Sequence, residues 1–467
     1  MCGIFGIHSD QVDVANLTYF GLFSLQHRGQ ESAGIAVGDR RTVRTHRGMG
    51  LVTQVFDPAS LRELPGVAAV GHTRYSTTGA SRGENAHPLT FEHPTLGPGA
   101  IAHNGNLINA DAIHRELAEA GVPFDSGTDT EVVARLIERT HGLDWDDVLT
   151  RVFSRLVGAY ACAVVTRDCI IALRDPYGFR PLCLGFLPLA SGQPAHVVAS
   201  ESCALDTVNA TFVREVQPGE MVRLDDHGVT SHQFQRAGRH AMCIFEFIYF
   251  ARPDSVLKSC ELEEARLRMG RELARELPVE ADIAFGVPDS GTPAAIGYAE
   301  ESGITYREGL VKSRYINRTF IQPDQSLRDA GVLLKLNPLR RSLRGKRVVV
   351  VDDSLVRGTT TRRTIEALRK AGAAEVHMRI SSPPMRFPCF MGVDIASTKE
   401  LVASRRSVEE VRGLIGADSL AYLSIPGLLR AVGRGTADEF CRACFDGDYP
   451  VPVPQQLEMD KLAMEVV

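Results

Sequence analysis

Short apolar runs separated by Gly, Pro and Asp recur through the first half of the chain. They lie at residues 4–7, 35–37, 67–70, 159–165, 170–173 and 197–200. Runs of this length between turn residues predict strands. Two stretches instead carry helical periodicity. One covers about 14–25, and the other begins after Thr128, a candidate N-cap with Glu131 three residues later. We therefore expect a sheet-rich domain with helices packed on it.

The second half of the chain alternates strand-like runs with helical patterns. Strands are expected at 283–287, 347–351 and 375–380, with a helix over about 360–371 between the last two. This alternation predicts βαβ units and a parallel sheet. A polar stretch at 225–239 separates the two patterns. We place the domain boundary there, with a first domain over 2–235 and a second over 236–467.

Composition narrows the classes of protein that fit. A length of 467 residues suits two or three domains, and 44% apolar with 23% charged residues is ordinary for a globular chain. A net charge of -5 without basic tails gives no reason to expect nucleic-acid binding. No run reaches the roughly 18 apolar residues of a membrane span. The N-terminus lacks the pattern of a secretory signal, so we expect a cytoplasmic protein without a membrane partner.

Cys2 directly follows the initiator Met1. A small side chain at position 2 permits removal of Met1, which would leave Cys2 with both a thiol and a free α-amine. Such an amine has an ordinary pKa of about 8 and is suited to act as general base for its own thiol. The position of Cys2 alone nevertheless favours a structural role, in which it is a small residue in an edge strand.

Four polar motifs accompany this cysteine. They read Gln-His-Arg-Gly-Gln-Glu at 26–31, Gly-His-Thr-Arg-Tyr-Ser-Thr at 71–77, His-Asn-Gly-Asn at 103–106 and Ser-Gly-Thr-Asp-Thr-Glu at 126–131. Together they resemble the glutaminase domain of the N-terminal-nucleophile amidotransferases. The resemblance implies an αββα sandwich in which Cys2 attacks the amide of glutamine and forms a thioester. It also implies an oxyanion hole from the Asn104 side chain and the Gly105 backbone N–H.

The same resemblance assigns two substrate contacts. Arg74 matches the residue that grips the α-carboxylate of glutamine, and Asp129 matches the partner of the α-ammonium. Simpler interpretations exist, because Asn-Gly is a common turn signal and Asp129 could support the N-terminus of the following helix. The histidines in these motifs have no obligatory role in an amine-based mechanism, and we expect them to be structural: His27, His72 and His103.

Residues 348–361 read Val-Val-Val-Val-Asp-Asp-Ser-Leu-Val-Arg-Gly-Thr-Thr-Thr. The four valines predict a buried strand that ends in two carboxylates, and a short loop then opens a helix. Parallel sheets bind ligands beyond the carboxyl ends of their strands, and helix N-termini favour phosphate. Two acids there fit ribose hydroxyls or Mg²⁺. The alternative is a solvated acidic turn. No Gly-Lys-Ser/Thr is present, which excludes a P-loop.

This stretch resembles the phosphoribosyl pyrophosphate fingerprint of the type I phosphoribosyltransferases, whose fold is a doubly wound parallel sheet. The resemblance implies Mg²⁺ at Asp352 and Asp353. The pyrophosphate loop of that family resembles 287–293, and its flexible lid resembles 312–320. The implied substrate contacts are Asp289, Ser290, Lys312, Tyr315, Asp352, Asp353, Ser354, Arg357, Gly358, Thr359 and Thr360.

Both halves together resemble the glutamine phosphoribosylpyrophosphate amidotransferase family. Membership implies that ammonia from glutamine passes through an internal channel to C1 of phosphoribosyl pyrophosphate, with 5-phosphoribosylamine, glutamate and pyrophosphate as products. That reaction is the first committed step of de novo purine synthesis. The segment 249–252 resembles the one that joins the two sites. The family further implies homotetramers and feedback inhibition by purine nucleotides.

Cys441 and Cys444 form a C-x₂-C pair, which by itself suits a redox pair, half a zinc site or neither. The resemblance adds Cys243 and Cys389 as the other two ligands of the iron-sulfur branch of the family. Four thiolates suit a [4Fe-4S] cluster and also zinc, and the resemblance favours the cluster. We expect the other five cysteines to be ordinary buried or free thiols: Cys162, Cys169, Cys183, Cys203 and Cys260.

Two other classes share parts of this pattern. Glucosamine-6-phosphate synthase and asparagine synthetase carry the same glutaminase half, but the chain shows neither sugar-isomerase domains nor an ATP-pyrophosphatase motif. A non-catalytic regulator that binds phosphoribosyl pyrophosphate would not need Cys2, Arg74, Asn104 and Asp129 together. It would usually also carry a basic nucleic-acid-binding module, which the composition does not indicate.

Overall fold

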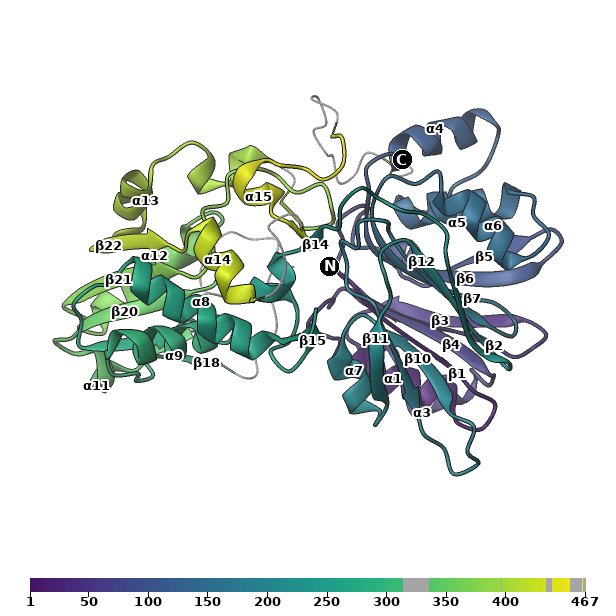
Figure 1. Cartoon of the computed structure of the whole chain (residues 1–467), viewed down its shortest axis with the longest axis horizontal. Coiled ribbons are helices and arrows are strands. Elements are labelled where there is room, and N and C mark those ends of the chain that lie inside the picture. Colours follow the sequence, from purple (N-terminus) through teal and green to yellow (C-terminus); the bar gives the residue numbers. More distant parts are fainter. Residues whose placement is uncertain (314–335, 396, 434–438, 454–463, 465–467) are drawn as a thin grey trace.

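The computed structural model describes residues 1–313, 336–395, 397–433, 439–453 and 464. Two bodies lie side by side in it (Figure 1). The N-terminal half, purple to teal in the figure, is built on two stacked antiparallel sheets, whereas the C-terminal half, mostly green to yellow, is built on one parallel sheet. The N-terminus lies where the two bodies meet, which places Cys2 at their junction.

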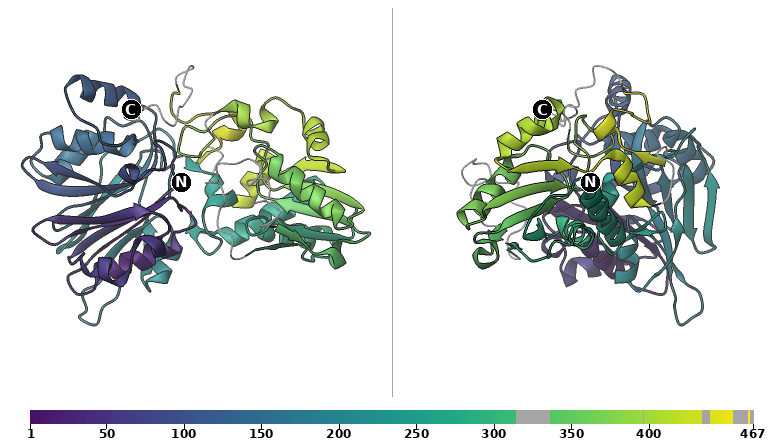
Figure 2. Two further views of the ribbon diagram at one scale, coloured as in Figure 1. Left: turned by 180° about the vertical axis from the view of Figure 1, so that it is seen from behind. Right: turned by 60° about the vertical axis from the view of Figure 1, so that its left-hand side comes forward.

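The two stacked sheets are covered by helices on their outer faces, an αββα sandwich that confirms the predicted fold (Figure 2). The first sheet has the order β11 (Thr211–Glu215), β9 (Cys183–Leu187), β10 (Ala195–Ala199), β1 (Gly3–His8), β4 (Ala68–Arg74), β2 (Ser32–Gly38) and β3 (Val43–Met49). The second has the order β13 (Gly228–Gln233), β12 (Glu220–Asp225), β8 (Ile170–Arg174), β7 (Gly158–Val165), β6 (Gly97–Leu107) and β5 (Leu89–His93).

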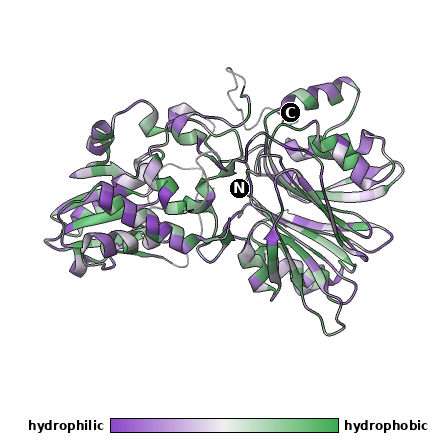
Figure 3. Ribbon diagram, viewed as in Figure 1, coloured by the Kyte–Doolittle hydropathy of each residue, from purple (hydrophilic) through white to green (hydrophobic). Residues whose placement is uncertain are grey.

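Three apolar layers hold this sandwich together. Between the sheets, small side chains such as Ala102 and Ala163 pack against Ile4 and Val70, so the sheets approach closely. Outside the first sheet lie α1 (Val14–Ser24), α2 (Val52–Val55), α3 (Pro58–Arg62) and α7 (Ser202–Thr207), and outside the second lie α4 (Ala110–Glu119), α5 (Asp129–Arg139) and α6 (Trp145–Phe153). Figure 3 shows the apolar residues following the strands of both sheets.

The second half is a doubly wound parallel sheet, again as predicted. Its order is β17 (Ile283–Gly286), β20 (Arg347–Asp352), β21 (Glu375–Ile380) and β22 (Ser419–Tyr422). Val349 and Val351 face α8 (Leu262–Glu276), α9 (Gly291–Ser302) and α14 (Ile425–Val432). Val348 and Val350 face α11 (Arg340–Leu343), α12 (Thr359–Lys370) and α13 (Val408–Ile415). The run of valines is therefore apolar throughout because both faces of the strand are covered.

Short elements complete the second half and join it to the first. They are β14 (Met242–Cys243) paired with β23 (Phe440–Cys441), β15 (Val256–Leu257) with β16 (Cys260–Glu261), β18 (Leu310–Lys312) with β19 (Leu336–Pro338), the π-helix η2 (Glu246–Phe250), the 3-10 helices η3 (Thr398–Glu400) and η4 (Val402–Ser404), and α15 (Ala443–Asp446). The 3-10 helix η1 (Gly83–Asn85) lies in the first half, between β4 and β5. The side chains of η2 pack with α8 and α9 in the core of the second half.

Several elements of the structure were not predicted from the sequence. The polar stretch 225–239, where we placed the domain boundary, contains β13, whose residues are almost all exposed because it is the edge strand of its sheet. An edge strand that faces water lacks the apolar pattern used to predict strands. The helices α4 and α6 were not predicted. Within the described residues, no helix is both long and apolar enough to cross a membrane.

Candidate functional site

The predicted nucleophile lies where the two stacked sheets meet. Cys2 directly precedes β1, and its backbone N–H donates to Asn104 Oδ1 on β6 of the other sheet at 3.1 Å. Its Sγ lies 3.6 Å from the carbonyl oxygen of Tyr75. Asn104 is fully buried, and its Nδ2 has no hydrogen-bond partner among the described residues. A buried donor is rarely left unpaired without a function, and a developing oxyanion needs such a donor.

Gly105 follows Asn104 in the same strand, and the neighbouring backbone leaves no room for a side chain there. A Cβ at this position would lie 1.9 Å from the carbonyl oxygen of Ala159, so only glycine fits. The second half of the chain supports this strand from outside, since Asn106 Nδ2 donates to the Phe390 carbonyl at 3.0 Å. A Cβ on Gly392 would lie 2.8 Å from Gly105 O. The loop that carries Cys389 therefore packs directly on the predicted oxyanion strand.

The two residues predicted to hold the ends of glutamine are both buried nearby. Arg74, at the end of β4, donates to the carbonyl oxygens of Ala80 at 3.0 Å and Thr78 at 2.9 Å, and lies 3.8 Å from Glu31. Asp129 begins α5 and accepts from the Leu107 backbone N–H at 3.0 Å. The Arg74 guanidinium thus shapes the 78–80 loop as well as offering positive charge, a contact that the sequence did not reveal.

The motif histidines are anchored by hydrogen bonds. His103 Nδ1 lies 3.1 Å from Thr130 Oγ1 and 3.6 Å from Asp129 Oδ1, and His72 Nε2 lies 3.0 Å from the His103 carbonyl. Burial raises the pKa of Asp129, but the opposing charge of His103 and its hydrogen bonds hold that pKa below its ordinary value. Burial lowers the pKa of His103, and Asp129 more than offsets this, so its pKa is raised. His27 bonds Glu201 rather than the nucleophile.

His72 makes the stability of the first domain pH-dependent. Burial, aided by the nearby Arg74 cation, lowers the pKa of His72 to about 3. The unfolded chain takes up a proton there below a pKa of about 6.5, whereas the folded chain does not, so stability is lost as the pH falls. Between about pH 7 and pH 5, proton uptake at His72 in the unfolded chain should lower the unfolding free energy by about 2 kcal/mol. We expect His72→Gln to abolish this part of the pH dependence. Urea unfolding at both pH values measures this.

The exposed histidine His141 supplies the matched control. His141→Gln should leave the pH dependence of unfolding as in the unaltered chain. An equal pH dependence in His72→Gln and the unaltered chain would contradict the assignment of the acid-labile group to His72.

The second predicted site lies at the carboxyl ends of the parallel strands. Asp352 ends β20, and Asp353 follows it, 7% exposed, with both carboxylate oxygens bonded to hydroxyls: Ser290 Oγ donates to Oδ2 and Ser354 Oγ to Oδ1. Ser290 lies just before α9, so the predicted pyrophosphate loop and the acidic pair meet at one edge of the sheet. Burial raises the pKa of Asp352, and its neighbour Asp353 raises it further. The pKa of Asp353 is also raised, mainly by burial.

The remaining predicted contacts surround this pair. Lys312 donates to Asp289, and Arg357 Nη2 donates to Glu400 Oε2 at 2.5 Å. Gly358, at a φ of 78°, turns the chain into α12, where Thr359 and Thr360 are exposed in the first turn. The helix therefore begins with accessible hydroxyls and backbone N–H groups, a favourable arrangement for phosphate. Tyr315 and most of the predicted lid lie outside the described residues.

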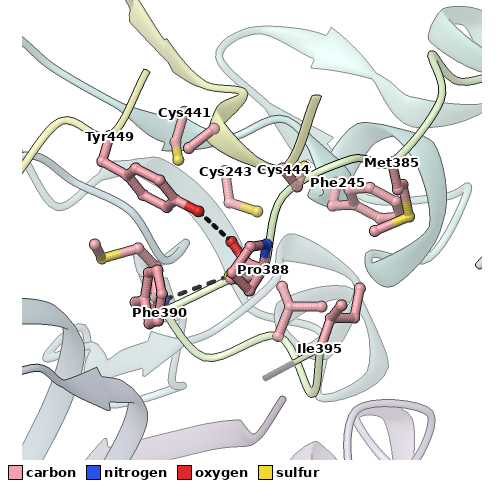
Figure 4. A pocket seen from close by; sticks show the side chains of 13 residues that line it. Cys243, Phe245, Met385, Pro388, Phe390, Ile395, Cys441, Cys444 and Tyr449 are labelled. Atoms are coloured by element: carbon pink, nitrogen blue, oxygen red, sulfur yellow. Dashed lines mark hydrogen bonds between the residues drawn. The ribbon is translucent and has the colours of Figure 1, made fainter. Parts of the chain in front are cut away.

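Four cysteines line one small cavity in the second half of the chain. Figure 4 shows Cys243, Cys441 and Cys444 around it, with Tyr449 Oη donating to the Pro388 carbonyl at 2.6 Å on one side. Cys389 also lines the cavity. Burial raises the pKa of Cys243 to about 12. Burial also raises the pKa values of Cys441 and Cys444, and the neighbouring thiols raise them further.

The chemistry of this cavity can be tested against two ligands. In the described part of the chain, no three His, Cys, Asp or Glu side chains converge closely enough to share a single metal ion. Zinc requires four ligands at about 2.3 Å from one point. None of the ten cysteines, all of which are described, forms a disulfide.

The structure also brings together charged residues that the sequence did not single out. Glu201, Glu246 and Arg180 are fully buried and interact with Arg28 or with each other beside the N-terminus. A sequence signal existed for Glu246, because it is one carboxylate within the apolar run Cys-Ile-Phe-Glu-Phe-Ile. A buried acid needs a partner.

Comparisons with known proteins define the class of each half. Residues 72–207 match a family described as a glutamine amidotransferase domain, and residues 262–381 match a phosphoribosyl transferase domain. A solved structure described as the allosteric regulatory enzyme of purine biosynthesis is 47% identical, covers 100% of this chain and 99% of its own, and superposes with a TM-score of 0.93. The chain thus joins a glutaminase to a phosphoribosyltransferase.

Relatives over the full length establish the family. The amidophosphoribosyltransferase of Synechocystis is 51% identical over 99% of this chain and 94% of its own. That of Archaeoglobus fulgidus is 49% identical over 97% of this chain and 99% of its own. The Bacillus subtilis glutamine phosphoribosylpyrophosphate amidotransferase, solved with ADP and GMP, is 47% identical over 97% and 98%, with a TM-score of 0.90. The chain belongs to the amidophosphoribosyltransferase family.

Proposed function

We propose that this enzyme hydrolyses glutamine at Cys2 and transfers the ammonia to C1 of phosphoribosyl pyrophosphate. The products are glutamate, 5-phosphoribosylamine and pyrophosphate, and the reaction begins de novo purine synthesis. One observation carries this conclusion. The cysteine that precedes β1 bonds Asn104, whose buried Nδ2 is unpaired among the described residues, while the second half of the same chain presents an acidic pair shortly before a helix whose first turn is exposed.

The glutaminase half-reaction follows from these positions. After removal of Met1, the α-amine of Cys2 takes the thiol proton, and Sγ attacks the amide carbon of glutamine. Asn104 Nδ2 and the Gly105 N–H stabilise the oxyanion, while Arg74 and Asp129 hold the α-carboxylate and α-ammonium. The amine passes its proton to the leaving nitrogen, which departs as ammonia. Water then hydrolyses the thioester to give glutamate.

The transferase half-reaction uses the edge of the parallel sheet. Asp352 and Asp353 hold the ribose side of the substrate, and the loop containing Ser290 receives the pyrophosphate. The N-terminus of α12, with Gly358, Thr359 and Thr360, receives the 5-phosphate. Ammonia attacks C1, and the C1–oxygen bond to pyrophosphate breaks. Exclusion of water is essential, because water would otherwise compete for C1.

Magnesium fits the acidic pair on the chemistry of its donors. Two adjacent carboxylates with raised pKa values favour a nearby cation, and Mg²⁺ is typically held by one or two carboxylates together with substrate phosphates. Asp352 and Asp353 would hold it. When bound, the ion would neutralise charge on the departing pyrophosphate.

A [4Fe-4S] cluster is proposed for the four-cysteine cavity. The four thiols share one cavity, yet no three described ligands converge on a single ion. Four cysteines are the usual ligands of such a cluster. Its role here is structural, because neither half-reaction transfers electrons.

We expect Cys444→Ser to lose the metal, because a hydroxyl is a poor ligand for iron. Anaerobically purified chain should contain about four iron and four sulfide per chain, and the variant markedly less. Iron, zinc and acid-labile sulfide analysis provides the measurement. Cys260→Ser, a buried cysteine outside the cavity, is the control and should retain full metal content. About one zinc per chain without sulfide would refute the cluster.

We propose the partners and the cellular location of this chain from its membership of the family. The Bacillus subtilis relative was solved with ADP and GMP, which supports purine nucleotides as feedback inhibitors of this chain. We further propose a homotetramer that works in the cytoplasm.

The proposed transfer can be followed atom by atom. Glutamine labelled with ¹⁵N in its amide should deliver that nitrogen to C1 of the phosphoribosyl group, detected as a ¹⁵N–¹³C1 coupling when labelled phosphoribosyl pyrophosphate is used. Label that appears only in free ammonium, while phosphoribosyl pyrophosphate stays intact, would contradict the proposal.

A further inference from the structure

A fully buried group of four charges joins the two halves of the chain. Arg28 Nε donates to Glu201 Oε1, and Arg28 Nη2 donates to Glu246 Oε2 at 2.7 Å. Arg180 Nη1 lies 3.4 Å from Glu246 Oε1. All four side chains are 0% exposed. Because two cations face two anions, the group is balanced, as a set of buried charges must be.

Each of the two acids binds residues in the half of the chain to which it does not belong. Glu201 follows β10 of the sandwich, and its Oε2 accepts from the Arg252 backbone N–H at 2.8 Å and from Ser255 Oγ at 2.6 Å in the second half. Glu246 begins η2, which packs in the core of the second half, yet it binds Arg28 and Arg180 of the sandwich. Each half therefore supplies an acid that the other half requires.

Both arginines adjoin the N-terminus that carries the nucleophile. Arg180 Nη1 contacts Met1 Sδ, and Arg180 Nη2 donates to the Met391 carbonyl, next to the Gly392 that abuts Gly105. Burial, aided by the cations Arg180 and Arg28, lowers the pKa of the Met1 α-ammonium to about 5. Both guanidiniums therefore lie near Met1, the residue before Cys2, and Arg180 also holds the loop that packs on the oxyanion strand.

The π-helix itself is held in place from the other side. Arg266 on α8 is 3% exposed, and it donates to the carbonyls of Phe247 at 2.9 Å and Ala251 at 2.6 Å. These bonds fix both ends of η2 against the parallel-sheet body. The carboxylate of Glu246 is thus presented on a rigid element, which is the usual condition for precise positioning.

We propose that Glu246 is a positioning residue for the glutaminase reaction, supplied by the second half of the chain. Its two carboxylate oxygens hold Arg28 and Arg180 in fixed places near the residue that precedes Cys2, and Arg180 in turn holds the loop that packs on the oxyanion strand. The glutaminase site is complete only when the second half is docked on it. This inference rests on the proposed glutaminase activity and adds a residue to it.

The test replaces Glu246 by the isosteric Gln in the full-length chain. Small displacements of catalytic groups cost on the order of 100-fold in rate. We therefore expect Glu246→Gln to lower kcat for glutamine-dependent synthesis about 100-fold, and to slow alkylation of Cys2 by a diazoketone analogue of glutamine to a similar extent. KM for glutamine should change less than about threefold, because Arg74 and Asp129 do not contact Glu246. Synthesis from added ammonium should stay within about twofold, because Glu246 makes no hydrogen bond to the acidic pair.

Glu220→Gln is the matched control. Glu220 is also a shielded carboxylate, 7% exposed and paired with Arg214 at 2.6 Å, but it lies on β12 within the sandwich. This variant should keep both activities. Should Glu246→Gln fail to fold, the charge-balanced Arg180→Gln/Glu246→Gln double variant carries the same test.

The possible outcomes separate this inference from the proposed function. Unchanged glutamine-dependent synthesis in Glu246→Gln, or equal loss of the glutamine and ammonium reactions in folded protein, overturns the positioning role. Absence of glutamine hydrolysis in the unaltered chain instead overturns the proposed function, on which the inference rests.

Discussion

Cys2→Ala should lower glutamine-dependent synthesis at least about 10⁴-fold while leaving synthesis from ammonium within about twofold. The variant keeps the backbone N–H that bonds Asn104 but has no Sγ to attack the amide carbon. The acidic pair and α12, which we propose receives the phosphate, lie in the other body, so ammonia supplied from solution should still reach C1. Pyrophosphate release with each nitrogen source provides the measurement.

A buried cysteine outside the site supplies the control. Cys162→Ala removes a thiol from β7 of the same sandwich and should leave both reactions intact. Full glutamine-dependent activity in Cys2→Ala would mean that another residue is the nucleophile.

Asp352→Asn should lower both reactions by about 10³-fold or more, because it removes a carboxylate that we propose holds the ribose side of the substrate and Mg²⁺. The same change should stabilise the fold. Burial and the adjacent Asp353 raise the pKa of Asp352, so its ionised form is disfavoured in the folded chain at neutral pH. We expect the melting temperature of the substrate-free protein to rise by a few degrees.

Asp282, which precedes the neighbouring strand β17 and bonds the opposite end of β20, supplies a matched control. Asp282 Oδ2 accepts from the Arg347 backbone N–H at 2.9 Å, which holds the pKa of Asp282 below its ordinary value. Asp282→Asn should therefore keep both activities without raising the melting temperature. Loss of activity with a lowered melting temperature in Asp352→Asn would indicate a structural role instead.

Local chemistry made much of the fold predictable. Thr128 was expected to cap a helix, and its side chain accepts from the Glu131 N–H at the start of α5. The valine run before Asp352 predicted a strand covered on both faces, because parallel strands exclude water from both. The edge strand β13 was missed because its residues are mostly exposed and polar, and they lack the alternation of apolar and polar residues that predicts a strand.

Contacts between residues far apart in the sequence were the part of the sites that the sequence could not predict. Local motifs pointed to Asn104 and the acidic pair, and the structure places each near the expected neighbours. The pairing of Arg28 with Glu246 joins residues 218 positions apart, so no local pattern could indicate it. Spacing likewise reveals Cys441 and Cys444, whereas the two other cysteines of the cavity join them only through the fold.

The central claim is that one chain couples glutamine hydrolysis to phosphoribosyl transfer. The most direct test measures glutamate and pyrophosphate together, on anaerobically purified protein supplied with phosphoribosyl pyrophosphate and Mg²⁺, with and without glutamine. The account predicts that pyrophosphate release depends on glutamine and that the two products form in equal amounts. Pyrophosphate release that ignores glutamine, or glutamate formation without any pyrophosphate, would contradict it.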